Sequence, residues 1–159
     1  MKYLVMGSGL QGRVVAYDIL QFEEGSQVIL ADIDDKNLEI AKSLIKNDNL
    51  SVEKFDIFNE EETVALMEKA DVIINSLPHT WEITESFYKA LAKTRDKKAV
   101  FTDYWLWEKH YQFDEALKEA NVLAVPGLGI VPGFGNICVG QLAHEFDQLE
   151  EAAIYCGGL

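Results

Sequence analysis

Basic residues, cysteines and long apolar runs are all scarce in this chain of 159 residues. Lysine and arginine total 14 against 27 acids, giving a formal charge of −13, and only Arg13 and Arg95 are arginines. A nucleic-acid-binding protein needs a concentrated basic face to displace counterions, so this composition argues against a nucleic-acid partner. The acidic excess is typical of a solvated surface that keeps a protein soluble, and it does not select a function.

The two cysteines, Cys138 and Cys156, are too few for a disulfide framework and form no Cys-x-x-Cys pair. We expect both to be buried thiols, and we expect no metal site, because no two of the three histidines have metal-ligand spacing. No apolar run reaches the roughly 18 residues of a membrane span. The first strand begins too close to Met1 to leave room for a signal peptide. These absences predict a cytoplasmic protein without a membrane partner.

The strongest motif lies in the first dozen residues. A short apolar run, residues 3–6, leads into Gly7-x-Gly9-x-x-Gly12, and a helix-period segment opens near Leu10. Gly7 permits a tight strand-to-helix turn, Gly9 lets the backbone approach a pyrophosphate, and Gly12 lets the helix pack closely on the strand. The N-terminus of that helix would direct its free N–H groups and its positive dipole end at the phosphates.

A second apolar strand, residues 27–32, ends in Asp32, which is 20 positions after Gly12. This separation is the one that the dinucleotide-binding fingerprint requires. A carboxylate here accepts hydrogen bonds from the adenosine ribose and repels a 2′-phosphate. Because no arginine lies between Arg13 and Arg95, none is nearby to bind that phosphate. The pattern predicts a site for NAD rather than NADP.

Strands and helices alternate up to residue 126. Six strands joined by helical crossovers predict an α/β fold, a doubly wound parallel (Rossmann) sheet in the order 3-2-1-4-5-6. The expected strands are residues 3–6, 27–32, 51–56, 71–77, 99–103 and 121–126, and the expected helices are 10–22, 36–45, 60–69, 82–94 and 113–120.

Residues 127–159 depart from this alternation. A glycine-rich segment, 127–136, precedes an expected helix over 137–146 and the start of a strand at 151–159. We expect residues 1–126 to form the dinucleotide-binding domain. Residues 127–159 would then be the Pro-Gly segment, the connecting helix and the first strand of a substrate domain that is otherwise absent, in a truncated chain. Apolar surface left uncovered in this way predicts a homodimer.

In an open parallel sheet the ligand lies beyond the carboxyl ends of the strands, at the switch point. His79 could relay protons in that cleft, although surface histidines are common; His110 and His144 are expected to be solvated. At Asp56 a plain loop-starting aspartate explains the sequence as well as a cofactor contact does. The candidate cofactor-binding residues are Gly7, Gly9, Leu10, Gln11, Gly12, Asp32, Ile33, Asp56, Ile57, Ser76, Leu77 and Pro78. The aromatic segment 104–107 either lines the cleft or packs on a second domain.

Several segments together resemble the N-terminal part of the saccharopine dehydrogenase family. They are the glycine loop and residues 75–80, 102–104, 127–136 and 155–159. Among the branches of that family, the chain is most similar to lysine 6-dehydrogenase. Asp32 stands where NADP-dependent saccharopine reductases carry Ser-Arg, and Val131 stands where they usually carry Asp.

The resemblance implies an NAD-dependent dehydrogenase that moves a hydride from an amine-bearing carbon of an amino acid or amine to nicotinamide, leaving an imine for hydrolysis. Asp103 and His79 are the candidate catalytic residues, and a structural hydrogen bond explains Asp103 as well. The resemblance also places much of the substrate pocket in a C-terminal domain. The alternatives are a saccharopine or carboxynorspermidine reductase, a non-catalytic NAD-binding module, and a methyltransferase that uses the glycine loop for S-adenosylmethionine.

Overall fold

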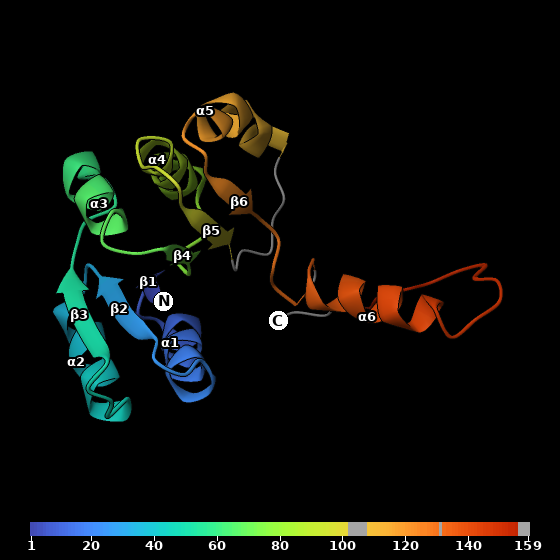
Figure 1. The fold of residues 1–159 in the computed structure, drawn as a ribbon, viewed down its shortest axis with the longest axis horizontal. Helices are drawn as coiled ribbons and strands as arrows, with labels where there is room; N and C mark the ends of the chain where they lie inside the picture. Colours follow the sequence, from blue (N-terminus) through green and yellow to red (C-terminus); the bar gives the residue numbers. More distant parts are fainter. Residues whose placement is uncertain (102–107, 131, 156–159) are drawn as a thin grey trace.

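The computed structural model describes residues 1–101, 108–130 and 132–155 (Figure 1). Six strands form one sheet in the order β3-β2-β1-β4-β5-β6, which confirms the predicted doubly wound topology. Every strand pair in the described part of the chain is parallel, so the sheet does not end in the antiparallel strand usual for methyltransferases. The strands are β1 (Lys2–Met6), β2 (Gln27–Asp32), β3 (Leu50–Lys54), β4 (Val72–Asn75), β5 (Lys98–Phe101) and β6 (Leu123–Val125).

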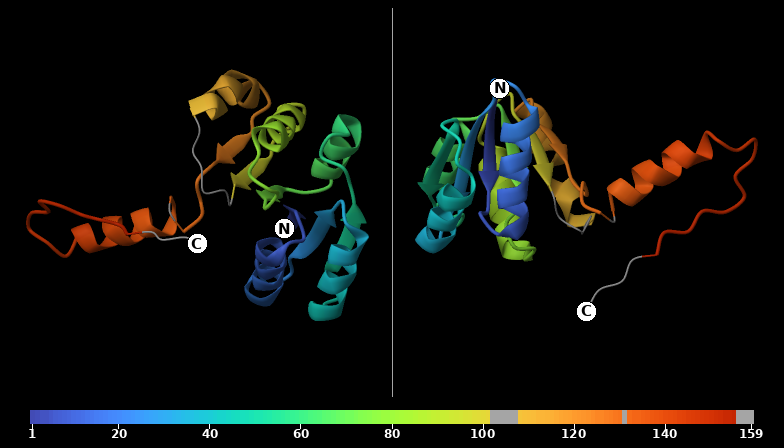
Figure 2. Two further views of the ribbon diagram at one scale, coloured as in Figure 1. Left: turned by 180° about the vertical axis from the view of Figure 1, so that it is seen from behind. Right: turned by 90° about the horizontal axis from the view of Figure 1, so that it is seen from below.

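Helices cover both faces of the sheet (Figures 1 and 2). One face carries α1 (Leu10–Phe22) and α2 (Asp35–Leu44), and the other carries α3 (Glu60–Met67), α4 (Trp81–Leu91), the 3-10 helix η1 (Glu108–Phe113) and α5 (Asp114–Glu119). Three of these helices begin where a capping side chain occurs in the sequence. Asp34, Asn59 and Thr80 each accept a hydrogen bond from a backbone N–H in the first turn.

The core is divided by the sheet into two layers. Leu4, Met6 and Ile73 point toward α3 and α4 and pack with Phe87 and Leu91. The alternate strand residues pack beneath α1 and α2, among them Val5, Leu30 and Ile74. Because β1, β2 and β4 are buried on both faces, their sequences are almost continuously apolar, which is why they could be recognised as strands.

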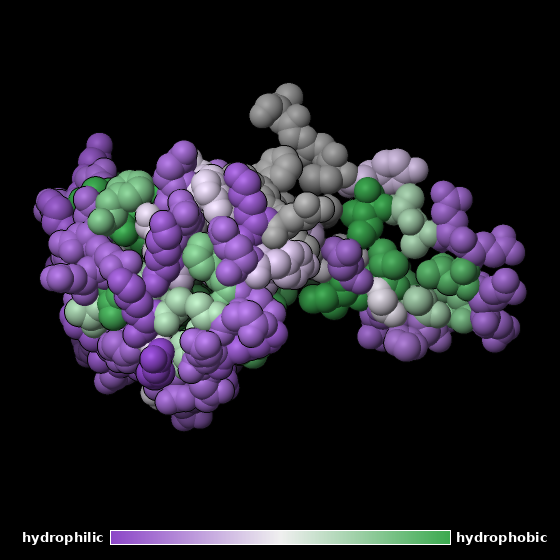
Figure 3. Space-filling view, turned by 90° about the horizontal axis from the view of Figure 1, so that it is seen from above, coloured by the Kyte–Doolittle hydropathy of each residue, from purple (hydrophilic) through white to green (hydrophobic). Residues whose placement is uncertain are grey.

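On the face of α1 and α2, helices cover β3, β2 and β1 but, within the described residues, not β5 and β6 (Figures 1 and 2). After β6, the helix α6 (Phe134–Ala143) projects from the body of the domain (Figures 2 and 3). In the described part of the chain, no helix is both long enough and apolar enough to cross a membrane.

Two expectations about the C-terminal part need correction. The helix expected over 137–146 begins three residues earlier, because the Asn136 side chain accepts the Gly133 N–H at 3.0 Å and closes the first turn from Phe134. Residues 151–155 form no strand, since no strand in the described part lies alongside to pair with them. Residues 156–159 lie outside the described part, and the assignment of 127–159 to a second domain stays a prediction.

Candidate dinucleotide-binding site

A cleft of about 580 Å³ lies at the carboxyl ends of the first four strands, a volume typical of small-molecule sites. The loops after β1, β2, β3 and β4 form its walls, so segments far apart in the sequence meet at the switch point of the sheet. All the predicted cofactor-binding residues except Gly12 line this cleft. The lining consists of Gly7, Gly9, Leu10, Gln11, Asp32, Ile33, Asp34, Asn37, Phe55, Asp56, Ile57, Phe58, Ser76, Leu77, Pro78, His79 and Ile83.

The three glycines of the loop are constrained differently. Gly7 has a φ of +98°, and a Cβ there would lie 2.5 Å from the carbonyl oxygen of Ser76. A Cβ on Gly12 would lie 1.8 Å from the carbonyl oxygen of Gly7, so its absence lets α1 approach the loop. Gly9 has an ordinary φ of −68°, and a Cβ there would meet nothing within 4 Å. The fold itself therefore requires glycine at positions 7 and 12 but not at position 9.

Asp32 ties the glycine loop to the corner between β2 and α2. Its Oδ2 accepts the Ser8 N–H at 2.6 Å, its Oδ1 accepts the Asp34 N–H at 2.9 Å, and the residue is only 8% exposed. The sequence did not indicate this structural role. Because each carboxylate oxygen can accept two hydrogen bonds, the Asp32 side chain keeps acceptor capacity toward the cleft.

The end of the cleft beside β2 and β3 is acidic. Asp32, Asp34 and Asp56 line it, and no lysine or arginine does so within the described residues. Lys54, at the end of β3, forms an ion pair with Asp35 at 2.5 Å. Negative charge therefore predominates where the second and third strands end.

Asp56 and Phe58 form the outer wall at this end. Asp56 Oδ1 accepts the Phe58 N–H at 3.0 Å, so the Asp56 side chain shapes the turn after β3, as expected of a loop-starting aspartate. Phe58 is 62% exposed yet lines the cleft together with Ile33. Sequence reasoning missed Phe58; the available signal was an aromatic residue in a polar loop directly after a strand.

The opposite end of the cleft is built from the turn after β4. Asn75, itself buried, accepts the Leu77 N–H at 3.1 Å through Oδ1 and so shapes the path of residues 76–79. His79 is half-buried and lines the cleft, as the sequence predicted, and its catalytic role stays a prediction. Asp103 and the aromatic segment 104–107 lie outside the described residues.

His110 does not have the solvated position expected for it. It is only 6% exposed, and its ring lies 5.2 Å from that of Tyr88 and 6.3 Å from that of Trp81, on the opposite side of the sheet from α1. Burial of η1 against α4 is a long-range contact, which explains why local sequence did not reveal it. Cys138 is half-buried rather than buried, and Cys156 lies outside the described part. The described residues contain no group of three potential metal ligands.

Comparisons with known proteins agree with this architecture. Residues 3–125 match the family of the saccharopine dehydrogenase NADP binding domain. The chain is 24% identical to carboxyaminopropylagmatine dehydrogenase of Synechocystis sp. over 93% of its length, and 26% identical to saccharopine dehydrogenase [NADP(+), L-glutamate-forming] of Pyricularia oryzae over 98%. It covers 39% and 34% of those two proteins. Apo saccharopine dehydrogenase (L-Glu forming) from Saccharomyces cerevisiae superimposes with a TM-score of 0.75 at 15% identity, over 91% of this chain and 31% of that one.

The two named relatives are a carboxyaminopropylagmatine dehydrogenase and a saccharopine dehydrogenase, and neither is a lysine 6-dehydrogenase, so the branch suggested by the sequence stays a prediction. The similarity to lysine 6-dehydrogenase depended on Asp32 and Val131. Asp32 lines the cleft and underlies the predicted cofactor preference, so it does not distinguish one substrate from another. The family match, in contrast, extends from the first strand to the last residue of β6 and includes every loop that forms the cleft. The chain therefore belongs to the saccharopine dehydrogenase NADP-binding domain family.

Proposed function

We propose that this chain is the cofactor-binding part of an NAD-dependent dehydrogenase that acts on the CH–NH group of an amino-acid-derived amine, as saccharopine and carboxynorspermidine reductases do. The observation that carries the proposal is Gly9. Within the described residues nothing requires a glycine at this position, since its φ is ordinary and a Cβ there would meet no atom within 4 Å. Gly9 nevertheless lines the cleft at the start of α1, where a pyrophosphate needs close approach to the backbone.

The charges in the cleft favour NAD over NADP. A 2′-phosphate would bring about two negative charges to an end of the cleft that holds three aspartates and, among the described residues, no cation. The family model and the Pyricularia relative are named for NADP, so the preference proposed here differs from theirs. It depends on Asp32 and on the apolar Ile33 that follows it.

The double variant Asp32→Ser/Ile33→Arg is expected to reverse the cofactor preference. The substitutions remove the repelling carboxylate and add a guanidinium that binds phosphate bidentately at an exposed position of the cleft. Charge-assisted hydrogen bonds contribute about 1.5–3 kcal/mol, so we expect a change of roughly 10- to 100-fold in the ratio of the two dissociation constants. Titration of both reduced cofactors by fluorescence measures it.

A matched control is Asp32→Ser/Leu44→Arg, which makes the same change in net charge but places the arginine on the exposed end of α2, outside the cleft. It loses the same carboxylate but gains no arginine in the cleft, so its gain in affinity for NADPH should be smaller than that of Asp32→Ser/Ile33→Arg. Equal affinity of the unmodified chain for NADH and NADPH would contradict the proposed preference.

A second candidate function is that of lysine 6-dehydrogenase, which the Asp32 carboxylate and Val131 in the sequence favour. The chain spans about two fifths or less of the length of the two curated relatives, so substrate turnover belongs to the proposal and not to the cleft alone. In the described residues the cleft offers no cationic side chain to hold a substrate carboxylate. We therefore expect the chain itself to bind NAD without oxidising any of these amines.

A substrate panel on the product of the complete reading frame separates the candidates, with this chain as the cofactor-only control. We expect NAD-dependent oxidation of saccharopine or carboxyaminopropylagmatine with a kcat/KM at least about tenfold above that for L-lysine, a difference of roughly 1.4 kcal/mol in transition-state binding. The reverse order would identify a lysine 6-dehydrogenase. Tight NAD binding without turnover of any amine would leave the non-catalytic module as the function.

A further inference from the structure

The order of the strands indicates where the base of a bound dinucleotide would lie. With its pyrophosphate at the glycine loop after β1 and a ribose at Asp32 after β2, the dinucleotide proposed above runs across the sheet in the direction of β3. Neighbouring strands are about 4.8 Å apart, so the base attached to that ribose extends over the turn after β3. Ile33, Asp56 and Phe58 line the cleft at this point.

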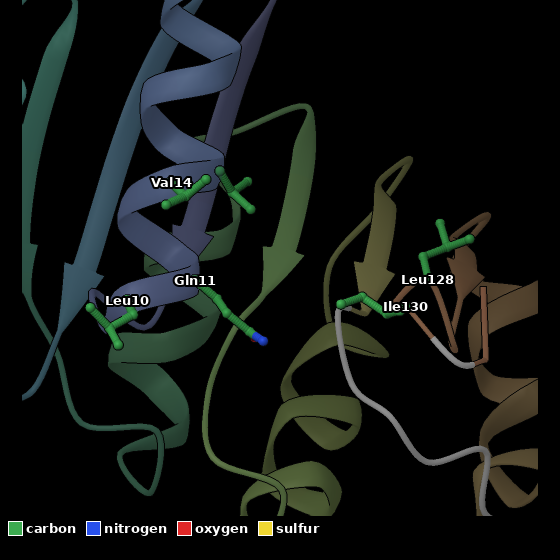
Figure 4. Close-up of a pocket in the computed structure, with 7 residues that line it drawn as sticks. Leu10, Gln11, Val14, Leu128 and Ile130 are labelled. Atoms are coloured by element: carbon green, nitrogen blue, oxygen red, sulfur yellow. The ribbon is translucent and has the colours of Figure 1, made fainter. Parts of the chain in front are cut away.

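A second depression next to the cleft has a different lining. Leu10 and Gln11 line both the cleft and this depression of about 470 Å³, which Figure 4 shows between α1 and residues 128–130. Apart from Gln11, the described side chains that line it are apolar. Carboxylate acceptors for a ribose and for an amino group on a base therefore lie together on the side of β2 and β3.

Asp56 is held in place by the hydrogen bonds of its own turn. Its carbonyl accepts the Asn59 N–H at 2.9 Å and the hydroxyl of the fully buried Thr63 at 3.3 Å, and its Oδ1 accepts the Phe58 N–H at 3.0 Å. Within the described part of the chain, Asp56 forms no ion pair and no group donates to its Oδ2. A ligand that displaces water from this half-buried oxygen must bring a donor of its own.

The other two aspartates of the cleft have structural hydrogen bonds. Asp32 accepts backbone N–H groups with both of its oxygens, and Asp34 accepts the Lys36 N–H at 2.9 Å at the start of α2. Asp34 is also exposed, whereas Asp56 is half-buried. Asp56 is therefore the carboxylate best placed to select a ligand group beyond β3.

Ile33 and Phe58 provide apolar surface beside Asp56. They are 59% and 62% exposed, so a planar base that packs against them would cover apolar surface that is now in contact with water. Stacking on an aromatic side chain stabilises any base, because every base has a π-face. The choice between bases thus depends on the hydrogen bonds made to the edge of the ring.

We propose that Asp56 binds the 6-amino group of adenine and so selects an adenine dinucleotide over one whose base has a carbonyl at that position. The assignment rests on the proposed dinucleotide function and names the residue that recognises the base. Adenine presents an N–H donor at position 6, whereas hypoxanthine and guanine present an oxygen acceptor. Because a carboxylate only accepts hydrogen bonds, two acceptors would face each other when the base has the 6-carbonyl.

Titration with two fluorescent dinucleotides, NADH and reduced nicotinamide hypoxanthine dinucleotide, tests the assignment. The unmodified chain should bind NADH at least about tenfold more tightly, as expected for one hydrogen bond to a charged group. Asp56→Asn keeps an oxygen for the Phe58 N–H and presents an amide NH₂ in place of Oδ2, so it should lower this ratio at least about tenfold. A residue that only shapes the turn would change both dissociation constants alike.

Two further variants serve as controls. Asp34→Asn removes the same charge from the same end of the cleft and keeps the oxygen that accepts the Lys36 N–H, so the ratio should not change. Phe58→Ala should weaken the binding of both dinucleotides by about 5- to 100-fold and also leave their ratio unchanged, because stacking does not distinguish the two bases.

The outcomes separate this assignment from the proposed function. Tight binding of NADH with equal affinity for the hypoxanthine analogue would overturn the assignment and leave the dinucleotide function intact. The same holds if Asp56→Asn changes the ratio no more than Asp34→Asn does. A chain that binds neither dinucleotide would overturn the proposed function and this assignment with it.

Discussion

Replacement of Gly9 by valine is expected to abolish dinucleotide binding while the chain stays folded. The backbone at position 9 has an ordinary φ, and a Cβ there would meet no described atom within 4 Å, so we expect the fold to be retained. The valine methyl groups would instead occupy the space at the start of α1 that a pyrophosphate needs. We expect NADH affinity to fall at least about 100-fold, roughly 2.8 kcal/mol, with a Tm close to that of the unmodified chain.

Gly140→Val is the matched control, because a Cβ on this glycine of α6 also meets nothing within 4 Å but lies outside the cleft. It should keep full NADH affinity. Retained affinity in Gly9→Val, measured by the same fluorescence titration, would show that the dinucleotide lies elsewhere.

Gly12→Ala is expected to destabilise the domain strongly. In an open helix position this substitution would stabilise by about 1 kcal/mol, because alanine has the higher helix propensity. Here the new Cβ would lie 1.8 Å from the carbonyl oxygen of Gly7; the backbone fixes the position of the Cβ and the oxygen is itself a backbone atom, so neither can rotate away. We expect a net loss of about 3 kcal/mol in the free energy of unfolding, or a fall of roughly 6–12 °C in Tm.

Gly9→Ala makes the same chemical change three residues away in open space and should alter the free energy of unfolding by no more than about 0.5 kcal/mol. Thermal and urea unfolding of the pair measures the difference. A Gly12→Ala variant as stable as the Gly9→Ala variant would contradict the close contact between α1 and the glycine loop.

The sequence could reveal the sheet because its strand signals and its glycine motif are local. Buried strands such as β1 and β4 are short apolar runs, and Asp34, Asn59 and Thr80 mark the helix starts within the residues that they cap. The position of His110 depends on how η1 packs on α4, which no local pattern encodes. Residues 151–155 have the composition of a strand, but a strand also needs a neighbour to pair with.

The candidate site likewise combines features that the local sequence reveals with features that depend on long-range packing. The glycine loop and Asp32 could be found because their spacing follows from the strand–turn–helix geometry of one β-α-β unit. The contribution of Phe58 depends on where the turn after β3 places it relative to Ile33, which is a matter of sheet order. That Asp32 also holds the Ser8 N–H could not be read from spacing alone.

The hydrogen bond from Ser8 to Asp32 has an entropic consequence for the cofactor. A loop with glycines at positions 7 and 9 would move freely if nothing held it, and fixing each residue costs about 1–2 kcal/mol. Because the buried Asp32 carboxylate orders the loop in the free protein, this entropy is lost during folding and not again on binding. For the proposed dinucleotide site, the loop is thus preorganised, and the affinity for the dinucleotide would report the contacts themselves.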